Sequence, residues 1–224
     1  MLRIFLDIET LPEDRGKLAR FPKLCDCDED EFRRLALSGD HGRLLTIGII
    51  IERNGKIIQS GCLGRDRQTM LFHLEERRTL TGFWKLLKGF NSSRDLIVTF
   101  NGISFDLPFL YKRSYVNRVK PSVELSFARY RKQPIFDVMM EWNKWDFRAK
   151  FISLDDLAKI LGLESSKTED MDGARVYDRF CEGAHEAIAS YCMADVQLTR
   201  RIYYRLVNPE EPDLVESEPC VENS

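Results

Sequence analysis

Asp7 and Glu9 are the first residues whose type and spacing suggest chemistry. They stand two apart in the β-rich segment from Leu2 to Ile8, so both carboxylates project from one face of the predicted strand. Neighbouring carboxylates repel each other, and a hard divalent cation such as Mg²⁺ or Mn²⁺ would offset that repulsion. A strand that runs out into a polar loop has the same pattern, so the pair alone is a weak indication of a metal site.

A third carboxylate, Asp106, follows an apolar segment, 96–100, that we expect to be a buried strand. Open α/β sheets tend to bind ligands at the carboxyl ends of such strands. Asp106 comes just before the start of a predicted helix, with Pro108 in its first turn, so an N-cap would also explain it. The sequence is hydrophobic on both sides of Asp106, however, which holds this carboxylate close to the core.

The fourth carboxylate, Asp195, lies on the longest predicted helix, 184–207. Tyr191 and Asp195 are four residues apart and share a face with Ile188 and Leu198. A tyrosine on such an apolar stripe is usually core packing. A buried aspartate is costly unless it has a cation or hydrogen bonds.

Four carboxylates and one phenol therefore arrive from different elements at inward or sheet-end positions. The charge of four carboxylates would be roughly cancelled by two divalent cations. Two cations about 3.5–4 Å apart can stabilise the attacking and leaving oxygens of phosphoryl transfer. A phenol beside them can orient the attacking water.

The elements that must position these side chains indicate a mixed α/β sheet flanked by helices. Strands are expected at 2–8, 44–51, 56–62 and 96–100, with the second and third joined by a hairpin at Asn54 and Gly55. Helices are expected at 77–89, 107–117, 138–144, 153–161, 174–180 and 184–207. Asp137 follows a short strand-like segment, and we interpret it as the N-cap of the helix that begins at Val138 rather than as an acid near the metals.

The three motifs, in this order, resemble those of the DEDD exonuclease superfamily, whose fold is RNase H-like. The segment 5–10 is similar to the first motif, 101–110 to the second, and Tyr191 with Asp195 to the third in its tyrosine form, DEDDy. The second and third are most similar to the exonuclease domains of B-family DNA polymerases and their free-standing bacterial relatives. The histidine form of the third motif would need His at position 190, which is Ser190.

The resemblance implies a role for each motif residue. The two divalent cations, Mg²⁺ or Mn²⁺, would be bound by Asp7, Glu9, Asp106 and Asp195, and Tyr191 would position the nucleophilic water. Near the terminal nucleotide the resemblance places Thr10, Leu11, Asn101 and Phe105. Members of the superfamily remove nucleotides from a 3′ end as 5′-monophosphates. We therefore expect a metal-dependent 3′→5′ exonuclease that acts on single-stranded ends, and we favour DNA over RNA.

Two other functions stay open. An exoribonuclease of the ribonuclease D type has the same tyrosine motif, and nothing in the sequence indicates recognition of the 2′-hydroxyl. A catalytically silent nucleic-acid-binding module is the third possibility, although all four acids and the tyrosine are present. Residues 111–150 interleave aromatics with ten Lys or Arg against four Asp or Glu, which suits contact with nucleic acid but also an ordinary amphipathic surface.

Composition sets the remaining expectations. The chain has 224 residues and a formal net charge of −2, and it contains no apolar stretch long enough to span a membrane. Residues 1–207 are expected to form one exonuclease domain, and the acidic residues 208–224 a disordered tail. The six cysteines show no spacing typical of zinc or disulfide modules, so we expect reduced thiols and a cytoplasmic protein. The polar insertion at 13–42 is expected to contain one short helix near 31–38, and its acidic run at 26–31 is interpreted as a solvated loop rather than as a metal site.

Overall fold

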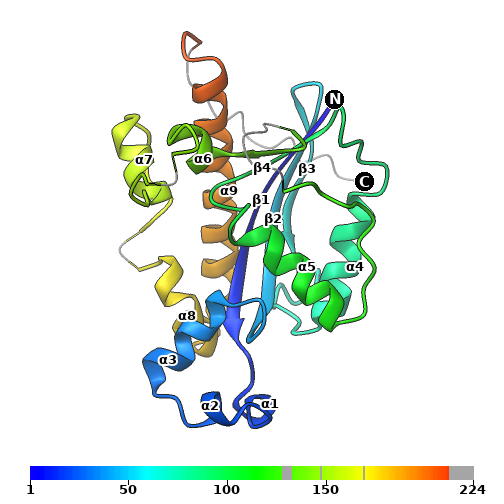
Figure 1. The fold of residues 1–224 in the computed structure, drawn as a ribbon, viewed down its shortest axis with the longest axis vertical. Helices are drawn as coiled ribbons and strands as arrows, with labels where there is room; N and C mark the ends of the chain where they lie inside the picture. Colours follow the sequence, from blue (N-terminus) through cyan, green and yellow to red (C-terminus); the bar gives the residue numbers. More distant parts are fainter. Residues whose placement is uncertain (128–132, 147, 169, 212–224) are drawn as a thin grey trace.

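The computed structural model describes residues 1–127, 133–146, 148–168 and 170–211 (Figure 1). A five-stranded sheet with the order β3-β2-β1-β4-β5 forms its centre. The strands are β1 (Leu2–Pro12), β2 (Gly42–Arg53), β3 (Lys56–Leu63), β4 (Leu96–Thr99) and β5 (Ile135–Asp137). β1 is antiparallel to β2 and parallel to β4, which confirms the expected mixed sheet.

β1 is the central strand, and its side chains alternate between two cores. Ile4, Leu6 and Ile8 enter one core. Phe5 enters the other, on the face from which Asp7 also projects. The predicted alternation at residues 4–8 is therefore confirmed, although the strand continues to Pro12 with a register shift between Glu9 and Thr10.

Helices cover both faces of the sheet. On the face of Ile4 lie α4 (Glu76–Leu86) and α5 (Asp106–Val116), which Figure 1 shows side by side. The opposite face is covered by the 23-residue helix α9 (His185–Val207), with α6 (Val138–Trp142) and α7 (Leu154–Ile160) beyond it. α9 contains ten buried residues, which is why its sequence shows a clear apolar stripe.

The insertion after β1 is more helical than expected. It forms α1 (Arg15–Leu18), α2 (Pro22–Cys25), α3 (Glu29–Arg34) and the 3₁₀ turn η1 (Leu35–Leu37). A second 3₁₀ turn, η2 (Gly173–Arg175), leads into α8 (Val176–Cys181), which contacts both β1 and α9. The acid-rich start of α3 is explained by helix capping, because Asp28 accepts a hydrogen bond from the Glu31 amide at 2.8 Å.

The end of the chain is described as far as residue 211. α9 ends at Val207, as predicted, and most of the expected tail, 212–224, lies outside the described residues together with Cys220. In the described residues, no helix is long and apolar enough to cross a membrane.

Candidate active site

The first three carboxylates meet where β4 stops pairing with β1. The β1–β4 ladder ends at Phe5 and Val98. Three residues further along β1, the Ile8 amide donates instead to Asp106 Oδ1 at 3.2 Å, so this carboxylate occupies the position that a longer β4 would have. Asp106 is the first residue of α5 and is 2% exposed. The same strand end carries Asp7 and Glu9.

The fourth carboxylate and the phenol come from α9. Tyr191 and Asp195 lie one turn apart on this helix, and both side chains are buried. α9 approaches the sheet closely because β2 has a glycine there. A Cβ on Gly48 would lie only 2.7 Å from Cys192 Sγ, so any larger residue would push the helix away. Gly48 is the cross-strand neighbour of Asp7.

The charges of these acids are strongly coupled. Burial first, and then repulsion from Asp106, Asp195 and Glu9, raise the pKa of Asp7 well above its usual value. Glu9 has a raised pKa for the same two reasons. Burial also raises the pKa of Asp106 to about 7 and that of Asp195, although hydrogen bonding by Ser166 and Tyr191 and the charge of Lys167 oppose the shift at Asp195. The four carboxylates therefore form a single anionic cluster.

A cavity of about 600 Å³ opens over this cluster. From the cluster, Asp7, Glu9, Asp195 and Tyr191 line it. Its opposite wall comes from the insertion and from α8, with Asp30, Arg33, Arg34 and Tyr177. Arg33 is engaged by Asp178 at 2.6 Å, whereas Arg34 is exposed and has no ion pair within the described residues. Sequence reasoning did not place the insertion here.

The four residues expected near the nucleotide divide into two pairs. Thr10 and Phe105 line the cavity. Leu11 is fully buried in a core cluster with Tyr191 and does not line it. Asn101 is also outside the lining. It lies in the turn before α5 with a φ of 59°, and its amide donates to Asp137 at 3.0 Å.

Asp137 holds the loop that presents Asp106. Its carboxylate accepts hydrogen bonds from the amides of Asn101 and Ile103, both at 3.0 Å, and from Met140 at 3.2 Å. The bond from Met140 is the N-cap of α6 that the sequence predicts. The bonds to the loop were not predicted, because residues 36 positions apart in the chain give no local signal.

One further side chain reaches the cluster. Cys192 Sγ is 3.9 Å from Asp7 Oδ2, and one ligand atom each of Asp7, Glu9 and Cys192 lie within 4.8 Å of one another. Sequence analysis assigned Cys192 no role, since it lies alone on a helical stripe. His185 packs at the start of α9, where its Nδ1 accepts a hydrogen bond from the Phe72 amide.

The donor set fits a hard divalent cation. All four clustered acids offer carboxylate oxygen, the ligand that Mg²⁺ and Mn²⁺ prefer. No lysine or arginine forms an ion pair with any of the four among the residues that the structure describes. After burial, repulsion from neighbouring carboxylates is a cause of the raised pKa of Asp7 and of Glu9, and a bound cation would relieve that repulsion.

The five-stranded sheet flanked by helices matches the fold of the exonuclease domain of family B DNA polymerases. The family B DNA polymerase of the hyperthermophilic archaeon Pyrobaculum calidifontis matches with a TM-score of 0.61 and 18% identity. The match covers 92% of this chain and 24% of the polymerase, so the chain spans about a quarter of that protein. Among curated protein sequences, none shows significant similarity.

The chain belongs to the family described as predicted 3′-5′ exonucleases related to the exonuclease domain of PolB, whose model matches residues 37–212. This confirms the resemblance seen in the sequence and the expected class of enzyme. The matched residues include Asp106, Tyr191 and Asp195, whereas Asp7 and Glu9 precede them.

Proposed function

We propose that the protein hydrolyses the terminal phosphodiester bond at single-stranded 3′ ends, of DNA rather than RNA, and releases nucleoside 5′-monophosphates. Asp7, Glu9, Asp106 and Asp195 would hold two divalent cations, Mg²⁺ or Mn²⁺. The observation that carries the proposal is the convergence of these acids and Tyr191, from three distant segments, at one end of β1 beside one cavity. When bound, the cations would activate a water and stabilise the leaving oxygen.

The chain's own groups would orient the water and the strand. Burial and the nearby carboxylates raise the pKa of Tyr191 far above its usual value, so its hydroxyl stays protonated. A protonated hydroxyl could donate to the Asp195 carboxylate, and its oxygen could then accept a hydrogen bond from the attacking water. Phe105 offers a ring for stacking of the terminal base, and Arg34 an exposed charge for its phosphate.

The domain assignment is part of the same proposal. We assign residues 1–207 to one exonuclease domain, since strands, helices and cavity all lie within them. Residues 208–224 would be an acidic tail without a catalytic role.

The test is degradation of a single strand labelled at its 5′ end, with Mn²⁺ and with a chelator. We expect stepwise shortening from the 3′ end only when metal is present. Tyr191→Phe should lower kcat about 10²-fold or more while the melting temperature stays near the wild-type value. Tyr115→Phe, which changes an exposed tyrosine on α5, is the matched control and should have wild-type activity.

Degradation rates on DNA and RNA strands of the same sequence distinguish a DNA exonuclease from an exoribonuclease of the ribonuclease D type. Faster degradation of RNA would favour the ribonuclease D type of activity and contradict the preference for DNA. A strand that is bound but stays intact with both Mg²⁺ and Mn²⁺ would overturn the proposal and favour a silent binding module.

A further inference from the structure

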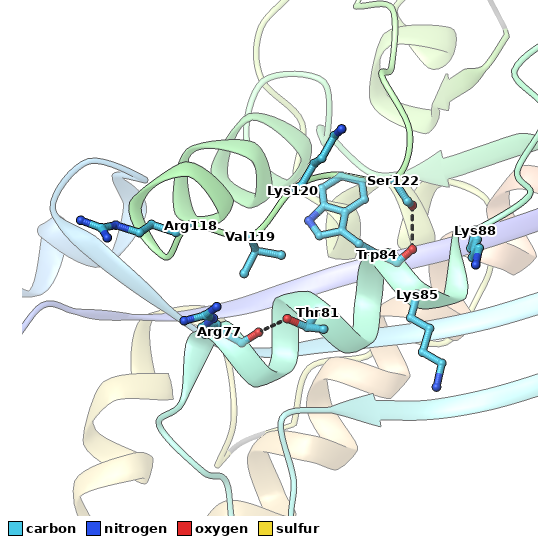
Figure 2. A pocket seen from close by; sticks show the side chains of 9 residues that line it. All are labelled: Arg77, Thr81, Trp84, Lys85, Lys88, Arg118, Val119, Lys120 and Ser122. Carbon is cyan, nitrogen blue, oxygen red and sulfur yellow. Dashed lines mark hydrogen bonds between the residues drawn. The ribbon is translucent and has the colours of Figure 1, made fainter.

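A second concave site lies on the opposite side of the sheet from α9. It is a groove of about 400 Å³ between α4 and the segment that follows α5 (Figure 2). We call it the basic groove, and it is lined by Arg77, Thr81, Trp84, Lys85, Lys88, Arg118, Val119, Lys120 and Ser122. Five of these nine residues are cations and none is acidic.

The five cations of the basic groove are available to a ligand. All five side chains are exposed, and none forms an ion pair with another described residue. The contrast is Arg113 on α5, which is buried and held by Glu76 at 2.6 Å and Glu13 at 3.5 Å. Glu76 is therefore committed to Arg113 and does not neutralise its neighbour Arg77.

The helix dipole explains the positions of only some of the cations in the basic groove. Lys85 and Lys88 stand at the C-terminal end of α4, where the helix dipole favours cations. Arg77 is in the first turn of the same helix, where the dipole disfavours a cation. Figure 2 shows Arg77 together with Arg118 at one end of the groove, and Lys85 and Lys88 at the other.

The floor of the groove offers no aromatic ring on which a base could stack. Trp84 is only 3% exposed, and its indole N–H donates to Ser114 Oγ at 2.8 Å, so its ring is not free to stack on a base. The hydroxyls of Ser122 and Thr81 donate to the carbonyls of Trp84 and Arg77, both at 2.6 Å. An anion in the groove would therefore be bound by the cations, without recognition of its bases.

One hydrogen bond links the start of α4, at the Arg77 end of the basic groove, to the end of the sheet that carries the acids. Glu76, next to Arg77, accepts a hydrogen bond from the Leu44 amide at 2.8 Å, and Leu44 is the cross-strand neighbour of Thr10. A strand whose 3′ end is at Thr10 would thus find the Arg77 end of the groove at the same end of the sheet.

We propose that the basic groove binds the phosphodiester backbone of the nucleic-acid substrate upstream of its 3′ end, by charge and without sequence preference. This proposal rests on the function proposed above. A long strand would be held at both sites, and a strand of a few nucleotides at the acidic cavity alone. The four acids of the cavity repel phosphate without metal, so the groove would supply much of the affinity of the metal-free protein.

The test compares three variants of the full chain in binding a fluorescent single strand of about 20 nucleotides. Binding is measured by anisotropy in a chelator, which prevents cleavage. In Lys85→Gln/Lys88→Gln/Lys120→Gln we expect affinity for the strand to fall by up to about a hundredfold at about 0.1 M salt. The slope of log affinity against log salt concentration should decrease in magnitude by about 2, because each phosphate contact contributes about 0.7. The corresponding triple change to arginine should bind as the wild type does.

The matched control removes three exposed cations outside the groove, in Arg53→Gln/Lys56→Gln/Lys144→Gln. It changes net charge equally and should keep wild-type affinity. A groove variant that binds the strand as tightly as the wild type, or a control that binds as weakly as the groove variant, would overturn the proposal.

A second measurement separates this proposal from the proposed function. Cleavage of an oligonucleotide of about four nucleotides in Mn²⁺ should be equally fast in wild type, groove variant and control, since the groove is not reached. Loss of cleavage in the groove variant alone would contradict the assignment to upstream backbone. If the wild type cleaves nothing, the nuclease proposal fails, and the anisotropy data still decide whether the groove binds nucleic acid.

Discussion

At the scale of single residues, the proposed function requires Asp7 to be ionised for metal binding, whereas burial disfavours its ionised form. Three neighbouring acids and burial raise the pKa of its carboxyl group, so its ionised form destabilises the metal-free protein. We expect Asp7→Asn to abolish cleavage and to raise the melting temperature of the metal-free protein at pH 8. A gain of about 1 kcal/mol would correspond to about 2–4 °C in a chain of this size.

Calorimetry or circular dichroism in a chelator checks this expectation for Asp7→Asn. Asp146→Asn, at an exposed aspartate, changes the same charge outside the cluster and should leave both activity and melting temperature unchanged. A lower melting temperature for Asp7→Asn would contradict the idea that repulsion dominates here.

The sequence alone reveals those side chains whose burial is unfavourable in their local sequence context. Asp195 on an apolar helical stripe and the Asp7–Glu9 pair are recognisable because each breaks a pattern that burial would otherwise impose. Arg34 and Cys192 reach the site without breaking any pattern, since an arginine on a short polar helix and a cysteine on an apolar face are ordinary. Their proximity to the acids is a property of tertiary structure alone.

At the scale of elements, the approach of α9 to β2 sets the position of Tyr191 and Asp195. Gly48→Ala would bring a methyl group to 2.7 Å from Cys192 Sγ and 3.0 Å from Val196. Because both contacts belong to the helix that carries the site, we expect a loss of about 1–3 kcal/mol in the free energy of unfolding and a larger relative loss of activity. Denaturant unfolding and the degradation assay measure the two effects.

Two further variants make the Gly48 experiment specific. In α4, Gly82 has no atom within 4 Å of an added Cβ, so Gly82→Ala should stabilise the protein by about 0.5–1 kcal/mol. Adding Cys192→Ala to Gly48→Ala removes the nearest clashing atom and should restore part of the activity. Unchanged activity in Gly48→Ala would mean that α9 can shift without moving the acids.

Elements with strong periodicity were predicted well, and those built from tertiary contacts were not. β2, β3, α5 and α9 begin and end within two residues of their predicted bounds because hydrophobic runs and a hairpin turn mark them. In the insertion the sequence predicts only one short helix, near 31–38, where α3 and η1 lie. Its helices are four to six residues long, too short for a periodic signal, and they are held by contacts such as Arg33 with Asp178, 145 residues away.

At the scale of the whole molecule, the anionic cluster makes stability depend on pH. The pKa of Asp106 is about 7 in the folded chain and would be about 3.9 in the unfolded chain. The folded state therefore binds the proton more tightly, and the stability from this group is present below about pH 4 and lost as the pH rises to about 7. We expect the melting temperature of the metal-free protein to fall between pH 5 and about 8.

Asp106→Asn should flatten that pH profile, since it removes a proton that only the folded state holds at pH 5–7. Thermal denaturation in a chelator across this range provides the measurement. A wild-type profile that rises toward pH 8 would mean that the four acids are not mutually repelling in the folded protein.

Metal should reverse the dependence, because cations bind the deprotonated carboxylates. We expect Mn²⁺ to raise the melting temperature more at pH 8 than at pH 5.5, with a stabilisation of about 2.7 kcal/mol when the free metal is about 100 times its Kd. Asp195→Asn should lose most of this gain. Equal stabilisation by Mn²⁺ at both pH values would contradict binding through the clustered acids.

The overall architecture was predictable because order and spacing of the motifs constrain it. Three motifs spread over residues 5–195 indicated the family, and the sheet order agrees with the polymerase fold. The basic groove was not predictable, since its cations come from residues 77–88, in and just after α4, and from the segment after α5, 30 or more residues apart. Charge counts along the chain detect an excess of bases but not which of them share a surface.

The bond between the Ile8 amide and Asp106 also offers a spectroscopic probe. The Ile8 amide donates directly to the carboxylate of Asp106, one of the four acids. Its proton resonance should shift as that carboxylate loses its proton or gains a metal, so an isotope-labelled sample would report the ionic state of the centre without substrate.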